Sequence, residues 1–183
     1  MENSDDFIVI TVNGPDAPGI VSSITSILSE NAVKIIDIEQ IVIRKLILLS
    51  MMLDLRESKG GQISLLKDLL LEAKRLNVEL DFKIASYDEH LQHDNNFMYA
   101  VTCLGEKITA QVVAQISNAI YSENVNIERI TQLSQGELSC IEMIVKTDKT
   151  INVQDMTGKL LSISSDFGVD IAVQKEDIFR RSK

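Results

Sequence analysis

The chain has 183 residues, of which 45% are hydrophobic and only 4% aromatic, so its core must be built mainly from Ile, Leu, Val and Met. The formal net charge of -9 argues against nucleic acid and anionic membranes as partners, because both bind through clustered Lys and Arg. The acidic start MENSDDFIV is unlike a secretory signal, no apolar stretch is long enough to span a bilayer as a helix, and the two cysteines make no disulfide framework. We therefore expect a cytoplasmic protein that binds neither membrane nor nucleic acid.

The first half of the chain predicts a strand, a helix, two strands, a second helix and a last strand. Apolar residues alternate where strands are expected and recur at helical spacing where helices are expected. The predicted elements are a strand at residues 7–13, a helix at 17–31, two strands within 33–55, a helix at 63–76 and a strand at 78–84. The two middle strands form a hairpin whose turn falls at the charged pair Arg44-Lys45.

The second half of the chain repeats this order after a polar stretch. Its predicted elements are a strand at residues 97–104, a helix at 109–122, strands at 125–133 and 138–146, a helix at 153–164 and a strand at 169–173. The pair Glu30-Asn31 after the first helix returns as Glu123-Asn124. We predict an α+β protein of two tandem ferredoxin-like domains, each an antiparallel sheet with helices on one face. The domains are expected at residues 1–87 and 97–179, with linkers at 88–96 and 180–183.

The segment NGPDAPGI, residues 13–20, holds both prolines of the chain and joins the first strand to the first helix. Asp16 is suited to capping the helix, with Pro18 tolerated in its first turn. Gly19 has no side chain, so another group can approach its backbone closely. The N–H groups of Gly19 and Ile20 lie at the positive end of the helix dipole, which suits a carboxylate. The spacing alone leaves two interpretations open, a structural corner and a carboxylate-binding site.

The repeated order of elements and the GPDAPGI turn resemble a pair of ACT domains, which are regulatory modules that commonly bind amino acids. The segments IDIEQIVIRKLILLSMML, LGEKITAQVV and VDIAVQKEDIFRRSK are similar to the N-terminal ACT pair of SerB-type bacterial phosphoserine phosphatases. The resemblance covers essentially the whole chain. It implies a module that binds L-serine or a related small amino acid and controls an attached phosphatase domain of serine biosynthesis.

The catalytic motif of that phosphatase family is not in this chain. The family's nucleophile motif begins with Asp-x-Asp, and no Asp-x-Asp occurs here. The nucleophile, the acid/base carboxylate and the bound Mg²⁺ would all belong to a phosphatase domain beyond Lys183. We therefore expect no metal, no other cofactor and no phosphoserine hydrolysis from these residues alone.

The resemblance also implies a ligand site in the first domain, residue by residue. Asp16 and Gly19 match the family motif at the first turn between strand and helix. By this resemblance the ligand lies where two ACT modules meet. Its carboxylate would bind the N–H groups of Gly19 and Ile20, and its ammonium group would bind Asn13 or Asp16.

The second domain matches the family motif less well. Gly105 and Thr109 are retained in LGEKITAQ and are the candidate ligand residues there. Gln111 stands where some relatives have a glycine, and its longer side chain would fill the pocket. The sequence therefore predicts one good site or two unequal ones.

Two other functions stay open at this stage, besides a regulatory domain of a phosphatase. The chain could be a stand-alone tandem ACT regulator, similar to the glycine-cleavage repressor family, that acts through a protein partner. It could also be an oligomerisation module that binds no ligand. In each case the exposed edge strands of small sheets predict a homodimer.

Neither a metal site nor a disulfide is expected from the remaining polar residues. His90 and His93 lie in the polar connector, where no predicted strand or helix would fix the geometry of metal ligands. Cys103 and Cys140 fall on neighbouring strands of the predicted second sheet, so their sulfurs are expected close together as free, buried thiols.

Overall fold

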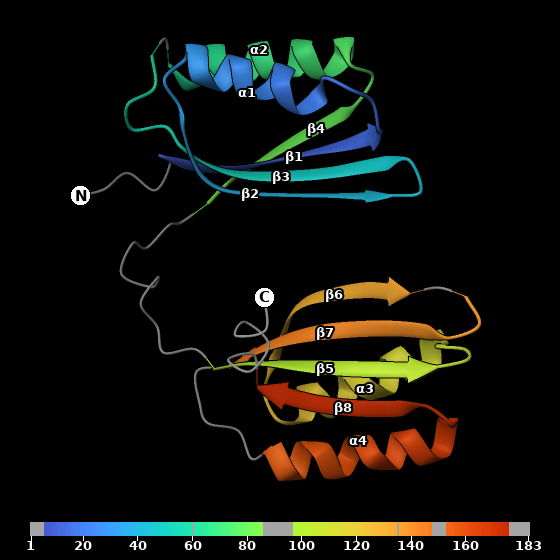
Figure 1. The fold of residues 1–183 in the computed structure, drawn as a ribbon. Helices are drawn as coiled ribbons and strands as arrows, with labels where there is room; N and C mark the ends of the chain where they lie inside the picture. The colour runs from blue at the N-terminus through green and yellow to red at the C-terminus, as the bar shows by residue number, and fades with distance from the viewer. Residues whose placement is uncertain (1–5, 60, 86–96, 135, 148–152, 176–183) are drawn as a thin grey trace. The chain divides into compact units, whose positions relative to one another are not determined.

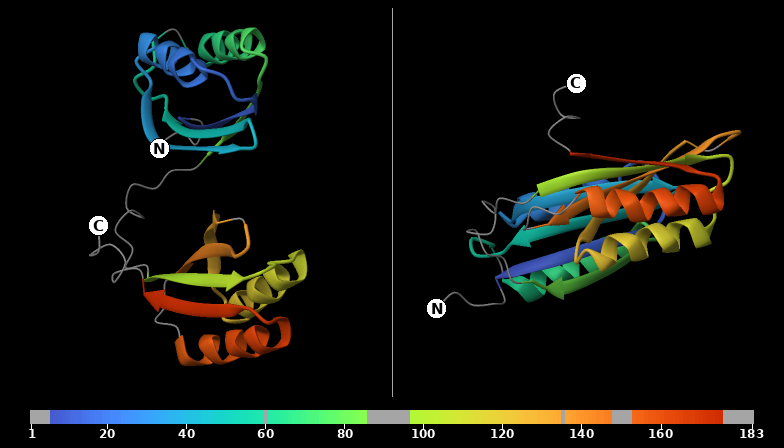
Figure 2. Two further views of the ribbon diagram at one scale, coloured as in Figure 1. Left: turned by 45° about the vertical axis from the view of Figure 1, so that its right-hand side comes forward. Right: turned by 90° about the horizontal axis from the view of Figure 1, so that it is seen from below.

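A computed structural model of the protein describes residues 6–59, 61–85, 97–134, 136–147 and 153–175. The chain forms two compact units, Met1–Glu89 and His90–Lys183, which we call unit 1 and unit 2. Each unit is a four-stranded antiparallel sheet with two helices on one face (Figures 1 and 2). The expected α+β fold, with the order βαββαβ occurring twice, is confirmed.

The two units contain the same elements in the same order. Unit 1 consists of β1 (Phe7–Pro15), α1 (Ile20–Glu30), β2 (Lys34–Ile43), β3 (Leu46–Asp54), α2 (Gln62–Arg75) and β4 (Glu79–Ile84). Unit 2 consists of β5 (Phe97–Gly105), α3 (Ala110–Ser122), β6 (Asn126–Ser134), β7 (Ser139–Thr147), α4 (Val153–Phe167) and β8 (Asp170–Lys175). The strand orders are β2-β3-β1-β4 and β6-β7-β5-β8, so the first strand of each unit is an inner strand.

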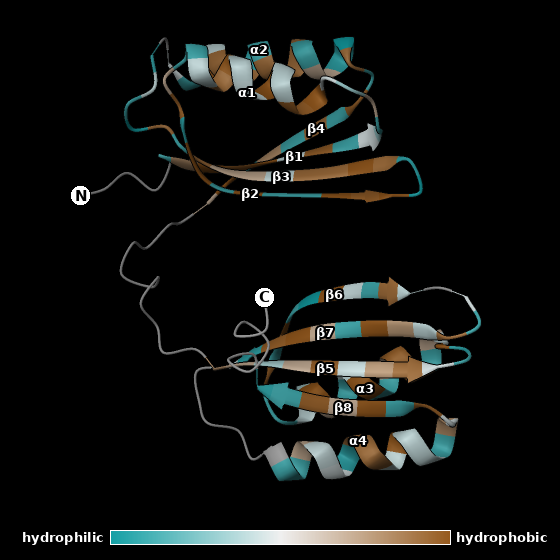
Figure 3. Cartoon of the chain, viewed as in Figure 1, coloured by the Kyte–Doolittle hydropathy of each residue, from teal (hydrophilic) through white to brown (hydrophobic). Residues whose placement is uncertain are grey.

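Alternating apolar residues on the inner strands build the core of each unit (Figure 3). In β1 the side chains that belong to the core cluster are Ile8, Ile10 and Val12, two residues apart, which places them on the face that the helices cover. In α1 the buried residues Ile20, Ile24 and Leu28 recur at every fourth position and form the stripe that packs against them. Each unit thus has its own hydrophobic core, as a small independent domain requires.

All four helices are followed by a residue in the left-handed conformation. These residues are Ala32, Asn77, Asn124 and Gly168, with φ of 54°, 55°, 56° and 64°. In the first case the next N–H, that of Val33, donates a 2.9 Å hydrogen bond to the Leu28 carbonyl, which closes the helix end. Because Ala32 and Asn124 hold equivalent places, the recurring Glu-Asn pairs are one position out of register. The repeat is therefore shown by the shared order of elements, and the two Glu-Asn pairs are not equivalent positions in it.

The two cysteines lie on neighbouring strands, as expected, but on opposite faces of the sheet. The register pairs Cys103 with Ile141 and Cys140 with Leu104, and a shift of one residue reverses the face. Cys103 is only 1% exposed and belongs to the core of unit 2, whereas Cys140 is half-buried. The expectation of two buried thiols is therefore corrected, because only Cys103 is buried and the two side chains lie on opposite faces.

We expect Cys140 to react with thiol reagents in the native protein while Cys103 does not. Burial raises the pKa of the Cys103 thiol to about 11, and its electrostatic interactions with nearby Cys140 and Asp170 add to the effect, so almost no reactive thiolate forms at pH 8. Labelling with a chromogenic disulfide at pH 8 should modify one thiol per chain, and Cys140→Ser should abolish it. Equal labelling of both thiols in the folded protein would contradict this prediction.

Candidate functional site

The turn between β1 and α1 differs from its predicted form in where the helix begins. The sequence predicts a helix from residue 17, capped by Asp16 and with Pro18 in its first turn. In the structure α1 begins at Ile20, and Gly19 is the N-cap residue, with φ 99° and ψ -12°. A residue with positive φ cannot continue a right-handed helix, so Pro18 and Asp16 remain in the turn before it.

Asp16 anchors this turn through its backbone and leaves its carboxylate in solvent. Its N–H donates a 2.8 Å hydrogen bond to the carbonyl of Lys45 in the hairpin between β2 and β3. Arg44 and Lys45 of that hairpin both have positive φ, 47° and 72°, as a tight two-residue turn requires. The side chain of Asp16 is exposed and does not cap α1. The capping role predicted for Asp16 is therefore wrong, and its role toward a ligand stays a prediction.

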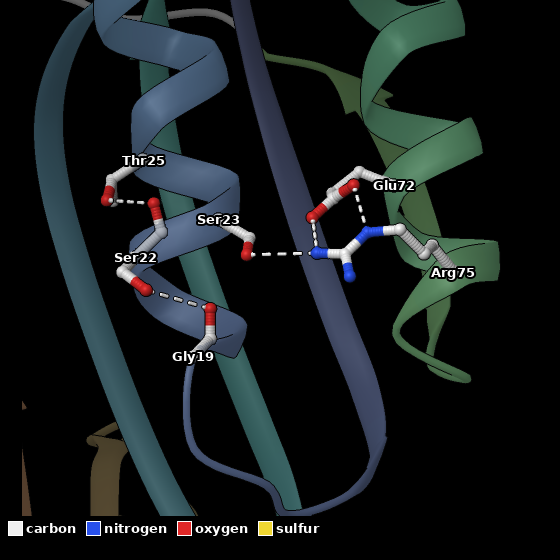
Figure 4. Close-up of polar contacts among 6 residues, drawn as sticks. All are labelled: Gly19, Ser22, Ser23, Thr25, Glu72 and Arg75. Carbon is white, nitrogen blue, oxygen red and sulfur yellow. Dashed lines mark hydrogen bonds and ion pairs between the residues drawn. The ribbon is translucent and has the colours of Figure 1, made fainter.

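The first turn of α1 leaves its backbone N–H groups without a side-chain cap (Figure 4). Ser22 donates its hydroxyl to the Gly19 carbonyl at 3.0 Å, so this hydroxyl is no cap for the N–H groups. Within the part of the chain that the structure describes, the N–H groups of Gly19 and Ile20 donate no hydrogen bond. A β-carbon on Gly19 would meet no atom within 4 Å, so the space beside it is open. This end of α1 can accept the oxygens of an anion.

An ion pair on α2 lies beside the first turn of α1. The Arg75 guanidinium donates two hydrogen bonds to the Glu72 carboxylate and a longer one, 3.5 Å, to the Ser23 hydroxyl (Figure 4). The hydrogen bond from Arg75 lowers the pKa of Glu72 below its usual value, so this carboxylate stays charged at neutral pH. The contact links the last turn of α2 to the first turn of α1.

A shallow pocket of about 400 Å³ opens beside the end of β1, between β1, α2 and β4. Asn13 of the predicted site lines it, whereas Asp16, Gly19 and Ile20 do not. Its other polar lining residues, Lys74, Asn77 and Glu79, are not among those predicted from the sequence. Gly14 lies so close to Val78 that a β-carbon on it would be 3.0 Å from Val78 Cγ1. This close approach places the turn after α2 against the end of β1 and brings Asn77 and Glu79 into the pocket wall.

In unit 2 the corresponding helix end is already capped by its own side chain. Thr109 is the N-cap of α3, and its hydroxyl accepts a 3.3 Å hydrogen bond from the N–H of Val112. Gly105 is buried, and a β-carbon on it would lie 2.8 Å from Val169 Cγ1, so it matches Gly14 and not Gly19. Gln111 lies exposed in the first turn of α3. Of the two residues predicted to bind a ligand in unit 2, Thr109 therefore caps α3, and Gly105 allows the end of β5 to pack against Val169.

Arg56 and Asp54 form another ion pair in unit 1. Arg56 donates hydrogen bonds to both carboxylate oxygens of Asp54, the shortest at 2.7 Å, and its guanidinium stacks 5.0 Å from the centre of the Phe7 ring. These bonds from Arg56 hold the pKa of Asp54 below its usual value. Among the described residues, no group of His, Cys, Asp and Glu side chains could hold a metal ion. His90 and His93 lie outside the described residues.

ACT-domain sequence profiles match both units, at residues 6–83 and 98–174. A phosphoserine phosphatase of Streptomyces coelicolor is 26% identical over 177 residues, which are 96% of this chain and 42% of that protein. Phosphoserine phosphatase SerB2 of Mycobacterium tuberculosis is 25% identical over 176 residues, with the same coverage of 96% and 42%. The chain thus spans less than half the length of these relatives. The UPF0237 protein MMP0657 of Methanococcus maripaludis is 34% identical over 99 residues, which are 54% of this chain and 96% of that protein.

Two solved structures share the tandem architecture. An unknown protein from Galdieria sulphuraria has a TM-score of 0.74 at 17% identity, over 93% of this chain and 98% of its own. A putative glycine cleavage system transcriptional repressor has a TM-score of 0.67 at 15% identity, over 92% of this chain and 96% of its own. At these identities the likeness shows the fold alone.

No helix within the described ranges is long and apolar enough to cross a membrane. The chain belongs to the ACT-domain family as a tandem pair, and it is distantly similar over nearly its whole length to phosphoserine phosphatases.

Proposed function

We propose that this chain is a regulatory module that binds a small amino acid, serine or a close analogue, and thereby controls a phosphoserine phosphatase domain. The observation that carries the proposal is the uncapped N-terminus of α1, at the motif that ACT domains use, in a chain related to phosphoserine phosphatases over 96% of its length. The module itself contributes binding and no catalytic group.

The ligand chemistry of unit 1 follows from the backbone at Gly19. The N–H groups of Gly19 and Ile20 bind the ligand carboxylate, assisted by the positive end of the α1 dipole. The open space beside Gly19 lets the carboxylate approach the backbone. The ammonium group of the same ligand binds the side chain of Asn13 or Asp16, which flank the turn in sequence. A zwitterion with a short side chain satisfies both groups.

The second site, at α3, is weaker than the first. Thr109 already supplies the hydrogen-bond acceptor that a ligand carboxylate would supply at this helix end. A carboxylate can bind there only by displacing that hydroxyl, which reduces the gain in free energy. Gln111, exposed in the first turn of α3, would further crowd a ligand at this helix end. We therefore propose unequal sites, with unit 1 as the sensor.

Regulation of the phosphatase domain follows from differential binding. A ligand changes activity elsewhere only if it binds one arrangement of the protein more tightly than another. We propose that the module forms a homodimer and that the occupied dimer stabilises one arrangement of the attached catalytic domain. The direction of the effect, activation or inhibition, is then set by which arrangement that is.

We expect L-serine to raise the midpoint of thermal unfolding of this chain and Gly19→Ala to abolish the rise. A ligand at about 100 times its dissociation constant adds about 2.7 kcal/mol to the stability of the state it binds, which corresponds to roughly 10 °C for a domain of this size. A methyl group at Gly19 would occupy the space that the carboxylate needs. A calorimetric or fluorescence melt across a panel of free amino acids measures both effects.

Gly61→Ala is the matched control for this experiment. Gly61 is the N-cap of α2, has a positive φ of 84°, and its β-carbon would also meet nothing within 4 Å. Both substitutions therefore carry a backbone strain of about 1–2 kcal/mol, and both lower the midpoint in the absence of ligand. Only Gly19→Ala should lose the response to serine. An equal response in the two variants, or none in the unaltered chain, would overturn the proposed site.

A further inference from the structure

The edge strand β4 of unit 1 exposes more apolar surface than the matching strand β8 of unit 2. Phe82 and Ile84 are 48% and 57% exposed and lie outside the core of unit 1. The register against the inner strand matches Phe82 with Val173, which is half-buried against the core of unit 2, and Ile84 with the charged Lys175. Of these two equivalent edges, the one in unit 1 therefore has the larger exposed apolar surface.

This apolar surface continues from β4 onto α2. A groove of about 600 Å³ runs along the helix and is lined by Phe82 together with Ile63, Leu66, Leu70 and Leu71. Phe82 pairs with Ile10 of β1, which places it on the helix-covered side of the sheet, facing the groove. Any element that extends the sheet at β4 would close this groove from the side.

The backbone of β4 shows which of its groups are available at this edge. The Ala85 N–H donates a 2.9 Å hydrogen bond to the Phe7 carbonyl, so the odd-numbered residues bond inward to β1. Because inward and outward groups alternate along an antiparallel strand, the N–H and C=O groups of Leu80, Phe82 and Ile84 point outward. An added antiparallel strand must place its own outward-pointing residues opposite these three.

We propose that β4 pairs with β4 of a second copy of this chain, with Phe82 of each copy on the two-fold axis. In this register Leu80 lies opposite the partner's Ile84, and all outward backbone groups of the three residues are satisfied. On the other face Asp81 lies opposite Lys83 of the partner subunit, and Lys83 lies opposite the partner's Asp81. Two opposite-charge pairs then flank the axis, and the apolar grooves of the two α2 helices meet on the helix side.

Charge complementarity selects this register and this edge. Shifting the pairing by two residues in one direction places Asp81 opposite its own copy, and shifting it in the other direction does the same to Lys83; like charges directly opposite are unfavourable. The other edge strand, β2, carries Asp37 and Glu39 but no basic residue between Lys34 and Arg44. A second copy would find no compensating charge along that stretch. The proposal names the edge used by the homodimer and does not depend on the amino-acid ligand.

Sedimentation equilibrium of the full chain tests the proposal. We expect the unaltered chain to form a dimer and Phe82→Glu to be monomeric, with unchanged circular dichroism. Asp81→Lys and Lys83→Asp should each weaken dimerisation about tenfold by opposing like charges. The double variant Asp81→Lys/Lys83→Asp restores both pairs with reversed sign, so it should dimerise like the unaltered chain. Ile41→Glu on the β2 edge is the control and should stay dimeric.

A monomeric unaltered chain would overturn the proposal, and so would a dimer that Phe82→Glu leaves intact. Failure of the double variant to recover dimerisation would reject the register. The serine-induced shift in melting midpoint, measured on Phe82→Glu, separates this result from the proposed ligand site, because loss of the dimer and loss of binding are then read independently.

Discussion

Replacing Leu160 by alanine is expected to lower the free energy of unfolding of unit 2 by about 2–5 kcal/mol. Leu160 lies on α4, is 1% exposed and belongs to the core of unit 2. The truncation removes apolar contacts and leaves a cavity that close-packed neighbours fill only in part. Urea unfolding followed by circular dichroism measures the change.

The next residue supplies the matched control. Leu161 is chemically identical but 54% exposed, because one helical step turns it away from the sheet. Leu161→Ala should change the free energy of unfolding by no more than about 0.5 kcal/mol. Losses of similar size at the two positions would contradict the packing of α4 described above.

Gly105→Ala is the second substitution with a large expected effect, a loss of about 1–3 kcal/mol. The new β-carbon would lie 2.8 Å from Val169 Cγ1, closer than any normal contact, and Gly105 is buried where β5 ends. Either Val169 or the strand must shift to relieve the overlap. Thermal or urea unfolding of the single variants and of Gly105→Ala/Val169→Ala measures the coupling between the two positions.

Gly136→Ala controls for the loss of a glycine as such. A β-carbon on Gly136 meets nothing within 4 Å, so alanine should be neutral or stabilise unit 2 by up to about 1 kcal/mol. If Gly105→Ala were equally neutral, or if Val169→Ala gave no relief, the close approach of β5 to the turn after α4 would not be the reason for this glycine.

Most of the fold could be predicted because its periodicities are regular. Apolar residues alternate at residues 7–13 and recur at every fourth position from Ile20 to Leu28, and these are the residues that the core buries. The same patterns recur in the second half of the chain. The start of α1 could not be predicted so well. Pro18 and Asp16 suit a helix N-terminus by residue type, but Gly19 adopts a left-handed conformation that delays the helix to Ile20.

The pocket beside the end of β1 was only partly predictable, because its lining residues come from distant segments. Asn13 is named by the motif, whereas Lys74, Asn77 and Glu79 reach the same pocket only through the turn after α2. The sequence did contain one sign of this packing, because Gly14 and Gly105 hold equivalent places at the ends of β1 and β5, and each lies against the residue that follows a helix turn. The register between strands could not be predicted from the sequence either. A difference of one residue in the pairing of β5 with β7 places the two cysteines on opposite faces of the sheet.

The most direct test of the central claim is to follow backbone amide resonances while L-serine is titrated into the isotope-labelled chain. The proposed function predicts saturable shifts for the amides of Gly19 and Ile20, whose N–H groups receive the carboxylate. It predicts smaller shifts, or shifts only at higher concentration, for Ala110 and Gln111, which follow the self-capped Thr109. If serine and related amino acids leave the Gly19 and Ile20 resonances unmoved, the turn is a structural corner and the account of this chain as an amino-acid sensor is wrong.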